Sequence, residues 1–344
     1  KQYGADALMQ EFSLSSEEGV ALMCLAEALL RIPDAQTRDD LIYEKLQEGN
    51  WKSHIGNSNS FFINAASYGL LFGKKISESL DENSLSNALT RSFSRLSAPI
   101  MRMAIIKSMQ ILGKQFVTGV TMQEALQNIK PRYEKGFTFS FDMLGEAAMT
   151  EADAQRYFND YLHAIEEVGK DAAGRTIYNG NSVSVKLSAI HPKYSRSKYD
   201  RTINELYPRL KELFLLAKKY NISINIDAEE ANRLELSLDL VEKLLDEPEL
   251  QGYKGIGFVV QAYSKRCPFV LDYLINLARE KQGYLMIRLV KGAYWDSEIK
   301  WAQADGLDGF PLYTRKNHTD ISYIACAKKL FAAQDVIYPQ FATH

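Results

Sequence analysis

The feature that most constrains the fold is an alternation of short apolar runs with helical segments, which begins near Thr138. Runs rich in Val, Ile and Leu have the length of a buried strand, and helical spacing follows each of the first five. Six such runs lie at 138–142, 183–187, 222–227, 257–261, 285–290 and 336–342. Strands that alternate with helices predict a parallel sheet, either in a (βα)8 barrel or in an open doubly wound fold.

The segments between these runs carry helix signals. Thr150 and Asp153 have the spacing of a capping box, which predicts a helix that begins directly after Thr150. Apolar residues recur at helical spacing in 207–217, 234–245 and 321–330, and Pro268 is placed to open a helix after the fourth run. Between residues 290 and 321 the sequence predicts a long loop.

The first third of the chain predicts helices without strands. Ser15 and Glu18 form another capping box, ahead of an apolar run that stops before Pro33. We therefore expect a helical arm and helical domain at 1–130. An α/β domain at 131–344 then contains about six of the eight strands of a barrel.

Polar residues stand at or just past the carboxyl end of each predicted strand. In a barrel all of these ends meet at one mouth, where that fold builds its chemistry. An open sheet would need a glycine-rich fingerprint after an early strand, whereas Gly255 precedes its strand and Val260 stands where a third glycine is required. The pattern favours a TIM-like (βα)8 barrel whose mouth carries Glu146, Lys186, Asp227, Gln261, Arg288, Lys291 and His344.

The segment 285–296 combines a buried strand with cations and flat rings. Arg288 lies inside the strand and Lys291 at its exit, so both need anions. Gly292 lets the backbone approach a ligand closely, and Tyr294 and Trp295 offer rings to stack on it. A large, planar, anionic cofactor fits this combination. The alternative is that Arg288 pairs with the carboxylate of a neighbouring strand while the aromatic residues only fill the core.

Two kinds of chemistry are compatible with the mouth. Lys186 could form a Schiff base, with Asp227 or Glu146 moving protons, which predicts an aldolase or a lyase. A redox enzyme uses more of the residues, because Arg288 and Gln261 suit the polar edge of an isoalloxazine and the segment 314–316 suits a pyrophosphate. A catalytic metal is disfavoured, since only His191 and His344 lie near strand ends.

Composition narrows the class of protein. The formal charge of −2 gives no basic field for nucleic acid, so we expect no nucleic-acid partner for this segment. Cys24, Cys267 and Cys326 show no CxxC spacing and fit reduced core thiols of a cytosolic protein. The longest apolar run, at 20–26, is far shorter than the ~18 residues of a membrane span.

Six ordered motifs resemble the strand-end motifs of the proline dehydrogenase family. They are Leu-Gly-Glu-Ala-Ala at 144–148, Val-Lys-Leu-Ser-Ala at 185–189, Ile-Asp-Ala-Glu-Glu-Ala at 226–231, Phe-Val-Val-Gln-Ala at 258–262, Arg-Leu-Val-Lys-Gly-Ala-Tyr-Trp at 288–295 and Phe-Ala-Thr-His at 341–344. The segments 24–33 and 49–54 are similar to the helical opening of the bifunctional bacterial proline-utilisation flavoenzymes. The resemblance implies a distorted barrel that binds FAD and oxidises L-proline to Δ1-pyrroline-5-carboxylate, with a membrane quinone as electron acceptor.

The resemblance also implies roles for individual residues. On the substrate side, Lys186 meets the proline carboxylate, Tyr294 packs on the ring, and Glu146 and Asp227 orient the cations. On the cofactor side, Arg288 and Gln261 face the flavin ring and Trp295 stacks near the adenine. The ribityl and phosphate part is expected to contact Val290, Lys291, Gly292, Ala293, Thr314, Arg315 and Lys316, and the set is completed by Thr343 and His344.

One departure from the family pattern concerns the carboxylate clamp. The family uses a pair of neighbouring arginines on the last barrel helix, and no Arg-Arg pair occurs in this sequence, which stops at His344. We therefore expect the isolated chain to bind proline analogues weakly. The parent enzyme is expected to carry an aldehyde dehydrogenase module after this segment and to lie in the cytoplasm, with peripheral contact at the inner membrane.

Overall fold

The computed structural model describes residues 117–343, and the statements below are confined to that range. The chain divides into two compact units, 1–128 and 129–344. The expected helices of the first third, the role of Cys24 and the role of His344 lie outside the described residues.

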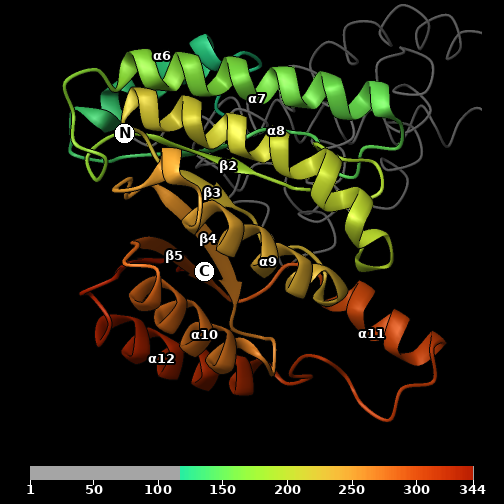
Figure 1. The fold of residues 1–344 in the computed structure, drawn as a ribbon. Coiled ribbons are helices and arrows are strands. Elements are labelled where there is room, and N and C mark those ends of the chain that lie inside the picture. Colours follow the sequence, from blue (N-terminus) through green and yellow to red (C-terminus); the bar gives the residue numbers. More distant parts are fainter. Residues whose placement is uncertain (1–116, 344) are drawn as a thin grey trace, which may run out of the picture. The chain divides into compact units, whose positions relative to one another are not determined.

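Strands and helices alternate along the described chain, as expected (Figure 1). The strands are β1 Ser140–Asp142, β2 Ser182–Val185, β3 Ile224–Ile226, β4 Ile256–Gln261, β5 Leu285–Val290 and β6 Ile337–Phe341. The α-helices are α6 Met122–Tyr133, α7 Glu151–Asp171, α8 Tyr199–Tyr220, α9 Leu234–Leu245, α10 Cys267–Glu280, α11 Trp295–Ala304 and α12 Lys316–Phe331. Short 3-10 helices are η3 Arg196–Lys198, η4 Ala231–Arg233 and η5 Pro248–Leu250.

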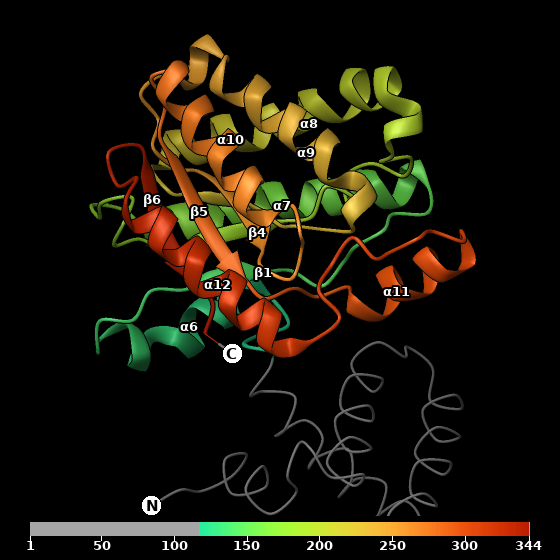
Figure 2. The ribbon, with the colours of Figure 1, turned by 90° about the horizontal axis from the view of Figure 1, so that it is seen from below.

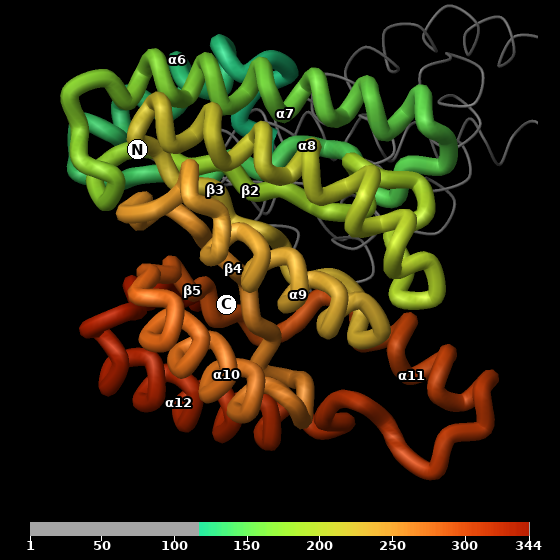
Figure 3. Tube along the Cα trace, viewed as in Figure 1, coloured from blue at the N-terminus to red at the C-terminus, as the bar shows by residue number. Residues whose placement is uncertain are grey.

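The sheet confirms the predicted fold class. Its six strands are all parallel and lie in the order β1-β2-β3-β4-β5-β6. The chain therefore returns from each strand through a helix to the next position in the sheet, a path that the tube in Figure 3 follows. This succession is that of a (βα)8 barrel of which six strands are present.

Local signals placed several elements correctly. The Thr150 side chain accepts a hydrogen bond from the Asp153 backbone at 3.1 Å, and Asp153 Oδ2 accepts one from Thr150 N at 3.2 Å, so the predicted capping box begins α7. The expectation of a long loop between 290 and 321 was wrong, because α11 lies within it. Only Glu298 and Ala302 of α11 are buried, so this helix has no apolar stripe that the sequence could reveal.

One face of the sheet is apolar and packs against helices. Val183, Ile224 and Phe258 are fully buried on this face, which α7, α10 and α12 cover. In Figure 1 α7 lies above the strands and α10 and α12 lie below them, with α11 standing apart from α10, and Figure 2 shows the same elements from below. Burial of large aliphatic and aromatic side chains on this face is the main source of stability for such a domain.

The opposite face is concave and polar. Arg288 on β5 donates to Ser184 on β2 at 2.9 Å and to Ser140 on β1 at 2.7 Å, although neither strand is its neighbour in the sheet. Such bonds require a sheet that curves until side chains on its inner face meet, as in a barrel. The side chains joined across this inner face belong to Ser140, Asp142, Ser184, Lys186, Asp227, Arg288 and Gln340.

Candidate active site

Lys186 is the centre of the polar cluster at the carboxyl ends of the strands. Its Nζ donates to Asp142 Oδ1 at 2.8 Å and to Asp227 Oδ2 at 3.0 Å. Asp142 is the last residue of β1, Lys186 directly follows β2 and Asp227 directly follows β3. The parallel register brings these three consecutive strand ends together, as the sequence predicted for Lys186 and Asp227.

The two carboxylates hold Lys186 in its charged form. Burial alone would lower the pKa of the amine, but the charge of Asp227 and the hydrogen bond to Asp142 raise it above its ordinary value of 10.5. A Schiff-base lysine must lose its proton to act as a nucleophile. The geometry therefore disfavours the aldolase alternative and suits an ammonium group that binds an anion.

Asp227 stands between two cations. Its carboxylate contacts Lys186 and also lies 3.8 Å from Nη1 of Arg288. Burial raises the pKa of Asp227, and the charge of Lys186 opposes that rise. The alternative expectation was that Arg288 pairs with the carboxylate of a neighbouring strand. Arg288 does lie near a carboxylate, but Asp227 follows β3, which is separated from β5 by β4.

A hollow of about 410 Å³ opens beside the ammonium group. Lys186, Asp142, Asp227 and Tyr294 all line it. Burial raises the pKa of Tyr294, so its hydroxyl stays protonated at neutral pH. The hollow unites predicted residues from five strand ends, and its lining comprises Asp142, Glu146, Lys186, Asp227, Ala228, Val259, Gln261, Val290, Gly292, Ala293 and Tyr294.

Gln261 lines this hollow and joins two of the segments that surround it. Its Nε2 donates to the Glu229 carbonyl at 3.0 Å, and its Oε1 accepts from Ala293 N at 3.0 Å. The amide thereby joins the segments that follow β3 and β5. Its expected contact with the edge of a flavin ring stays a prediction.

Gly292 has a backbone conformation and a position that exclude a side chain. Its φ is +147°, and a Cβ atom there would lie 2.4 Å from Cδ2 of Tyr263. The hydroxyl of Tyr263 accepts from Tyr294 N at 3.3 Å, so this ring supports the loop from below. The contact with the Tyr263 ring therefore requires a glycine here, and the expected approach of a ligand to this backbone stays a prediction.

Arg288 lies in a second hollow on the concave face. Besides its serine partners, its Nε donates to Gln340 Oε1 at 3.3 Å. This hollow has a volume of about 450 Å³ and includes Met286, Tyr338 and Gln340, but none of the Lys186 cluster. Among the described residues, Arg288 contacts the Lys186 cluster through the Asp227 carboxylate.

A basic group marks the start of α12. Lys291 and Lys316 both pair with Asp320, at 2.9 and 2.8 Å, so two cations share one anion. The N-cap position is Arg315, whose side chain makes no capping bond, and Thr314 beside it is exposed. Unpaired amide groups at a helix start, together with an excess of positive charge, suit a phosphate.

Other cofactor-side residues lie outside both hollows. Trp295 is 43% exposed and its Nε1 donates to the Tyr313 carbonyl at 3.3 Å, which leaves a face of the indole open for stacking. Thr343 is exposed.

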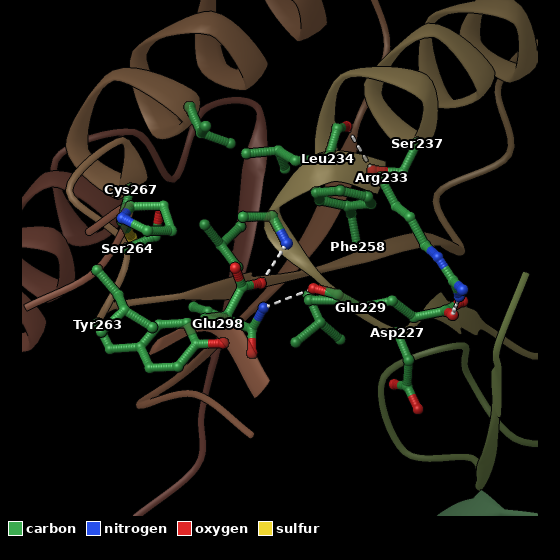
Figure 4. Close-up of a pocket in the computed structure, with 18 of the residues that line it drawn as sticks. Asp227, Glu229, Arg233, Leu234, Ser237, Phe258, Tyr263, Ser264, Cys267 and Glu298 are labelled. Atoms are coloured by element: carbon green, nitrogen blue, oxygen red, sulfur yellow. Dashed lines mark hydrogen bonds and ion pairs between the residues drawn. The ribbon is translucent and has the colours of Figure 1, made fainter. Parts of the chain in front are cut away.

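A small cavity of about 30 Å³ lies between β4, α9 and the start of α10 (Figure 4). It has room for about one water molecule and not for an organic ligand. Figure 4 shows Tyr263 and Glu298 on one side of it and Arg233 with Glu229 on the other. Glu229, Tyr263 and Glu298 were not anticipated as site residues from the sequence. Glu229 and Tyr263 lie just past the ends of β3 and β4, where the same strand-end rule could have found them, whereas Glu298 lies on α11, in a segment that was expected to be a loop. Asp142 was also missed, although it ends β1 as Lys186 follows β2.

Comparison with known proteins decides the family. The model of the family described as proline dehydrogenase matches residues 125–344. The chain belongs to the proline dehydrogenase family. A second model, described as the DNA-binding domain of proline dehydrogenase, matches residues 4–116. That description does not support the expectation that this segment has no nucleic-acid partner.

Relatives from several bacteria confirm the resemblance to the bifunctional proline-utilisation proteins. The bifunctional protein PutA of Klebsiella aerogenes is 62% identical over 338 residues, which are 98% of this chain and 26% of that protein. PutA of Escherichia coli is 62% identical over 337 residues, again 98% of this chain and 26% of the relative. The chain therefore spans about a quarter of the length of these relatives.

Solved structures show the same fold. A variant of proline utilization A from Bradyrhizobium japonicum superposes with a TM-score of 0.70 at 44% identity and covers 100% of this chain and 34% of that one. Proline utilization A from Bdellovibrio bacteriovorus, inactivated by N-propargylglycine, gives 0.68 at 27% identity over 96% of this chain and 34% of that one. These similarities agree with a barrel that this chain contains in part.

Proposed function

We propose that the barrel of this chain forms the site of a flavin-dependent proline dehydrogenase, which oxidises L-proline to Δ1-pyrroline-5-carboxylate. The observation that carries the proposal is the Lys186 ammonium held by Asp142 and Asp227 at the wall of a 410 Å³ hollow. A fixed cation there suits a small carboxylate, and family membership makes proline the first candidate.

The residues of the chain have separate tasks in this scheme. Lys186 neutralises the proline carboxylate, and its two aspartates keep it charged and aimed into the hollow. Tyr294 packs against the ring and limits the orientations that a bound substrate can adopt. Glu146 is exposed at the rim and orients cations around the carboxylate.

FAD is the cofactor that the donor set fits. The pyrophosphate would lie at the open start of α12, near Lys291, Arg315 and Lys316. The ribityl and phosphate part would contact Thr314 and the backbone at 290–293. The adenine would stack near Trp295. Arg288 and Gln261 are proposed to address the ring system, with Thr343 and His344 completing the set. Bound FAD would accept the hydride that leaves the proline ring carbon.

The whole protein is proposed to pass the electrons to a membrane quinone and to carry an aldehyde dehydrogenase module that uses the product. None of the described helices is long and apolar enough to cross a membrane. From the family resemblance we propose a cytoplasmic protein with peripheral contact at the inner membrane.

The test uses the natural full-length protein with L-proline and an artificial electron acceptor. We expect flavin absorption near ~450 nm that is bleached by L-proline. Lys186→Ala should keep the flavin and lose proline turnover, whereas Lys193→Ala, a change of an exposed lysine in the same loop, should behave as wild type. Absence of flavin, or no bleaching by L-proline, would overturn the proposal. Trapping of Lys186 by borohydride with a keto substrate would favour the Schiff-base alternative.

A further inference from the structure

A buried glutamate connects two of the loops that surround the hollow. The segment after β3 supplies Asp227, and the segment after β5 supplies Gly292 and Tyr294. Glu298, on the first turn of α11, is only 6% exposed. Its Oε1 accepts a hydrogen bond from Ala231 N at 2.6 Å, in the close-up of Figure 4.

Glu298 acts as a helix cap from a distant part of the chain. η4 begins at Ala231 and continues directly into α9, so its first amide groups need acceptors. The residue in the N-cap position, Glu230, makes no capping bond with its own side chain. The carboxylate of Glu298 takes that place and adds a negative charge at the positive end of the helix.

The carbonyl of Ala231 is held as well. Arg266 Nη2 donates to it at 2.6 Å, so both polar backbone groups of Ala231 are tied to side chains from other elements. Burial raises the pKa of Glu298, while the bond from Ala231 and the charge of Arg266 oppose that rise. Burial of a carboxylate costs desolvation free energy, so its presence here indicates that its position is important.

The other end of the connection is rigid. Glu298 N donates to the Tyr294 carbonyl at 3.0 Å, and Tyr294 N donates to the Tyr263 hydroxyl at 3.3 Å. Tyr294 is thus fixed to the same helical turn that carries Glu298. A shift of the Ala231 segment relative to α11 would change the separation of Asp227 from Tyr294.

We propose that Glu298 is a positioning residue that sets the spacing of Asp227 and Tyr294 and thereby the affinity for the substrate. This role rests on the proposed function of the hollow. Glu298 does not line the 410 Å³ hollow. Its effect passes through the two loops, so it should appear in substrate binding more than in the rate of the bound complex.

The experiment compares three variants of the natural full-length protein. Glu298→Ala removes the acceptor, and Glu298→Gln keeps an oxygen that can accept from Ala231 N while it removes the charge. Asp296→Ala is the matched control, because Asp296 is an exposed acid of the same helical turn. For each variant we would measure KM and kcat for L-proline and the Kd of the proline analogue tetrahydrofuran-2-carboxylate. We would also measure hydrogen exchange of the backbone amides at 228–234.

We expect Glu298→Ala to raise KM and the Kd about tenfold, the size of one lost charge-assisted bond, with kcat changed by less than about threefold. Exchange at 228–234 should become faster. Glu298→Gln should recover most of the affinity, and Asp296→Ala should match wild type in every measurement. If Glu298→Ala unfolds, Glu298→Gln takes its place in every comparison, and its KM should then lie above that of wild type by less than about tenfold.

Two results would overturn the role of Glu298. One is wild-type affinity and exchange in a folded Glu298→Ala protein. The other is an equal effect of Asp296→Ala, which would mean that the helix charge alone matters. A wild-type protein that does not oxidise proline would instead refute the proposed function, while the exchange of 228–234 would still test the bond from Glu298.

Discussion

Lys186 combines a buried position with two ionic partners, and the balance between them decides its chemistry. Its side chain is 15% exposed, similar to the 16% of Asp227, while Asp142 is 54% exposed. Desolvation lowers the pKa of Lys186, but Asp227 and Asp142 raise it by more, so the net shift is upward. The more exposed Asp142 is also the partner that a substrate carboxylate could displace most easily.

The raised pKa of Lys186 predicts a pH dependence of stability. A group whose pKa is higher in the folded than in the unfolded protein stabilises the folded state. This contribution is complete at a pH below the unfolded pKa, here 10.5, and is lost as the pH rises through the folded pKa. The difference in unfolding free energy between wild type and Lys186→Met should stay constant from pH 7 to about 10 and shrink above it. Urea unfolding at several pH values measures this, and a difference that shrinks below pH 9 would contradict it.

Replacement of Lys186 by arginine separates two roles of the lysine. Lys186→Arg keeps the charge but changes the geometry of the donors, so measurable proline turnover should remain with a higher KM. Steady-state kinetics of the full-length protein with normal flavin content would check this. Complete loss of turnover in a flavin-loaded variant would speak for a lysine that reacts as a nucleophile.

Arg288→Met should weaken FAD retention or lower the potential of the flavin. The variant loses charge-assisted bonds to two serines, each contributing on the order of 1.5–3 kcal/mol, and leaves Asp227 with a single cation. Flavin content and a redox titration measure the effect. Arg279→Met, which removes a 47% exposed arginine paired with Asp335, is the control and should change neither.

At the scale of single elements, the loop between β5 and α11 depends on one glycine. Gly292→Ala adds a Cβ 2.4 Å from the Tyr263 ring at a φ of +147°, with strain of about 1–3 kcal/mol. Gly306, at a φ of +63° with no atom near an added Cβ, is the matched position. Gly292→Ala should lower both the melting temperature and ligand affinity, whereas Gly306→Ala should lower at most the former. Equal effects of the two changes would show that the ring contact is unimportant.

The sequence predicted those parts of the structure that follow from local periodicity. β5 and α9 have the expected bounds, since apolar runs and helical spacing mark both. Lys186 and Asp227 meet because parallel strand ends share one edge, a rule that needs no coordinates. The sequence did not predict α11, because a helix with two buried residues has no apolar periodicity. It did not predict the role of Glu298 either, because a capping residue from another loop lies at no fixed distance along the chain.

At the scale of the whole molecule, the sheet of this chain has two unpaired edges. β1 and β6 each pair on one side only among the described strands. Free backbone groups along a strand favour association with other chains. We expect the purified 344-residue chain to self-associate, as measured by sedimentation. A monodisperse monomer would contradict this expectation.

The separation of the two strand faces bears on how such a protein can evolve. Side chains toward the helices provide the apolar burial that keeps the domain folded, and those toward the interior provide ions and hydrogen bonds. Adjacent positions along a strand therefore meet different physical requirements. A lineage could exchange Ser184 or Gln340 and alter what it binds, while Val183 and Phe341 beside them preserve the scaffold. New specificity is accessible here by changing every second residue.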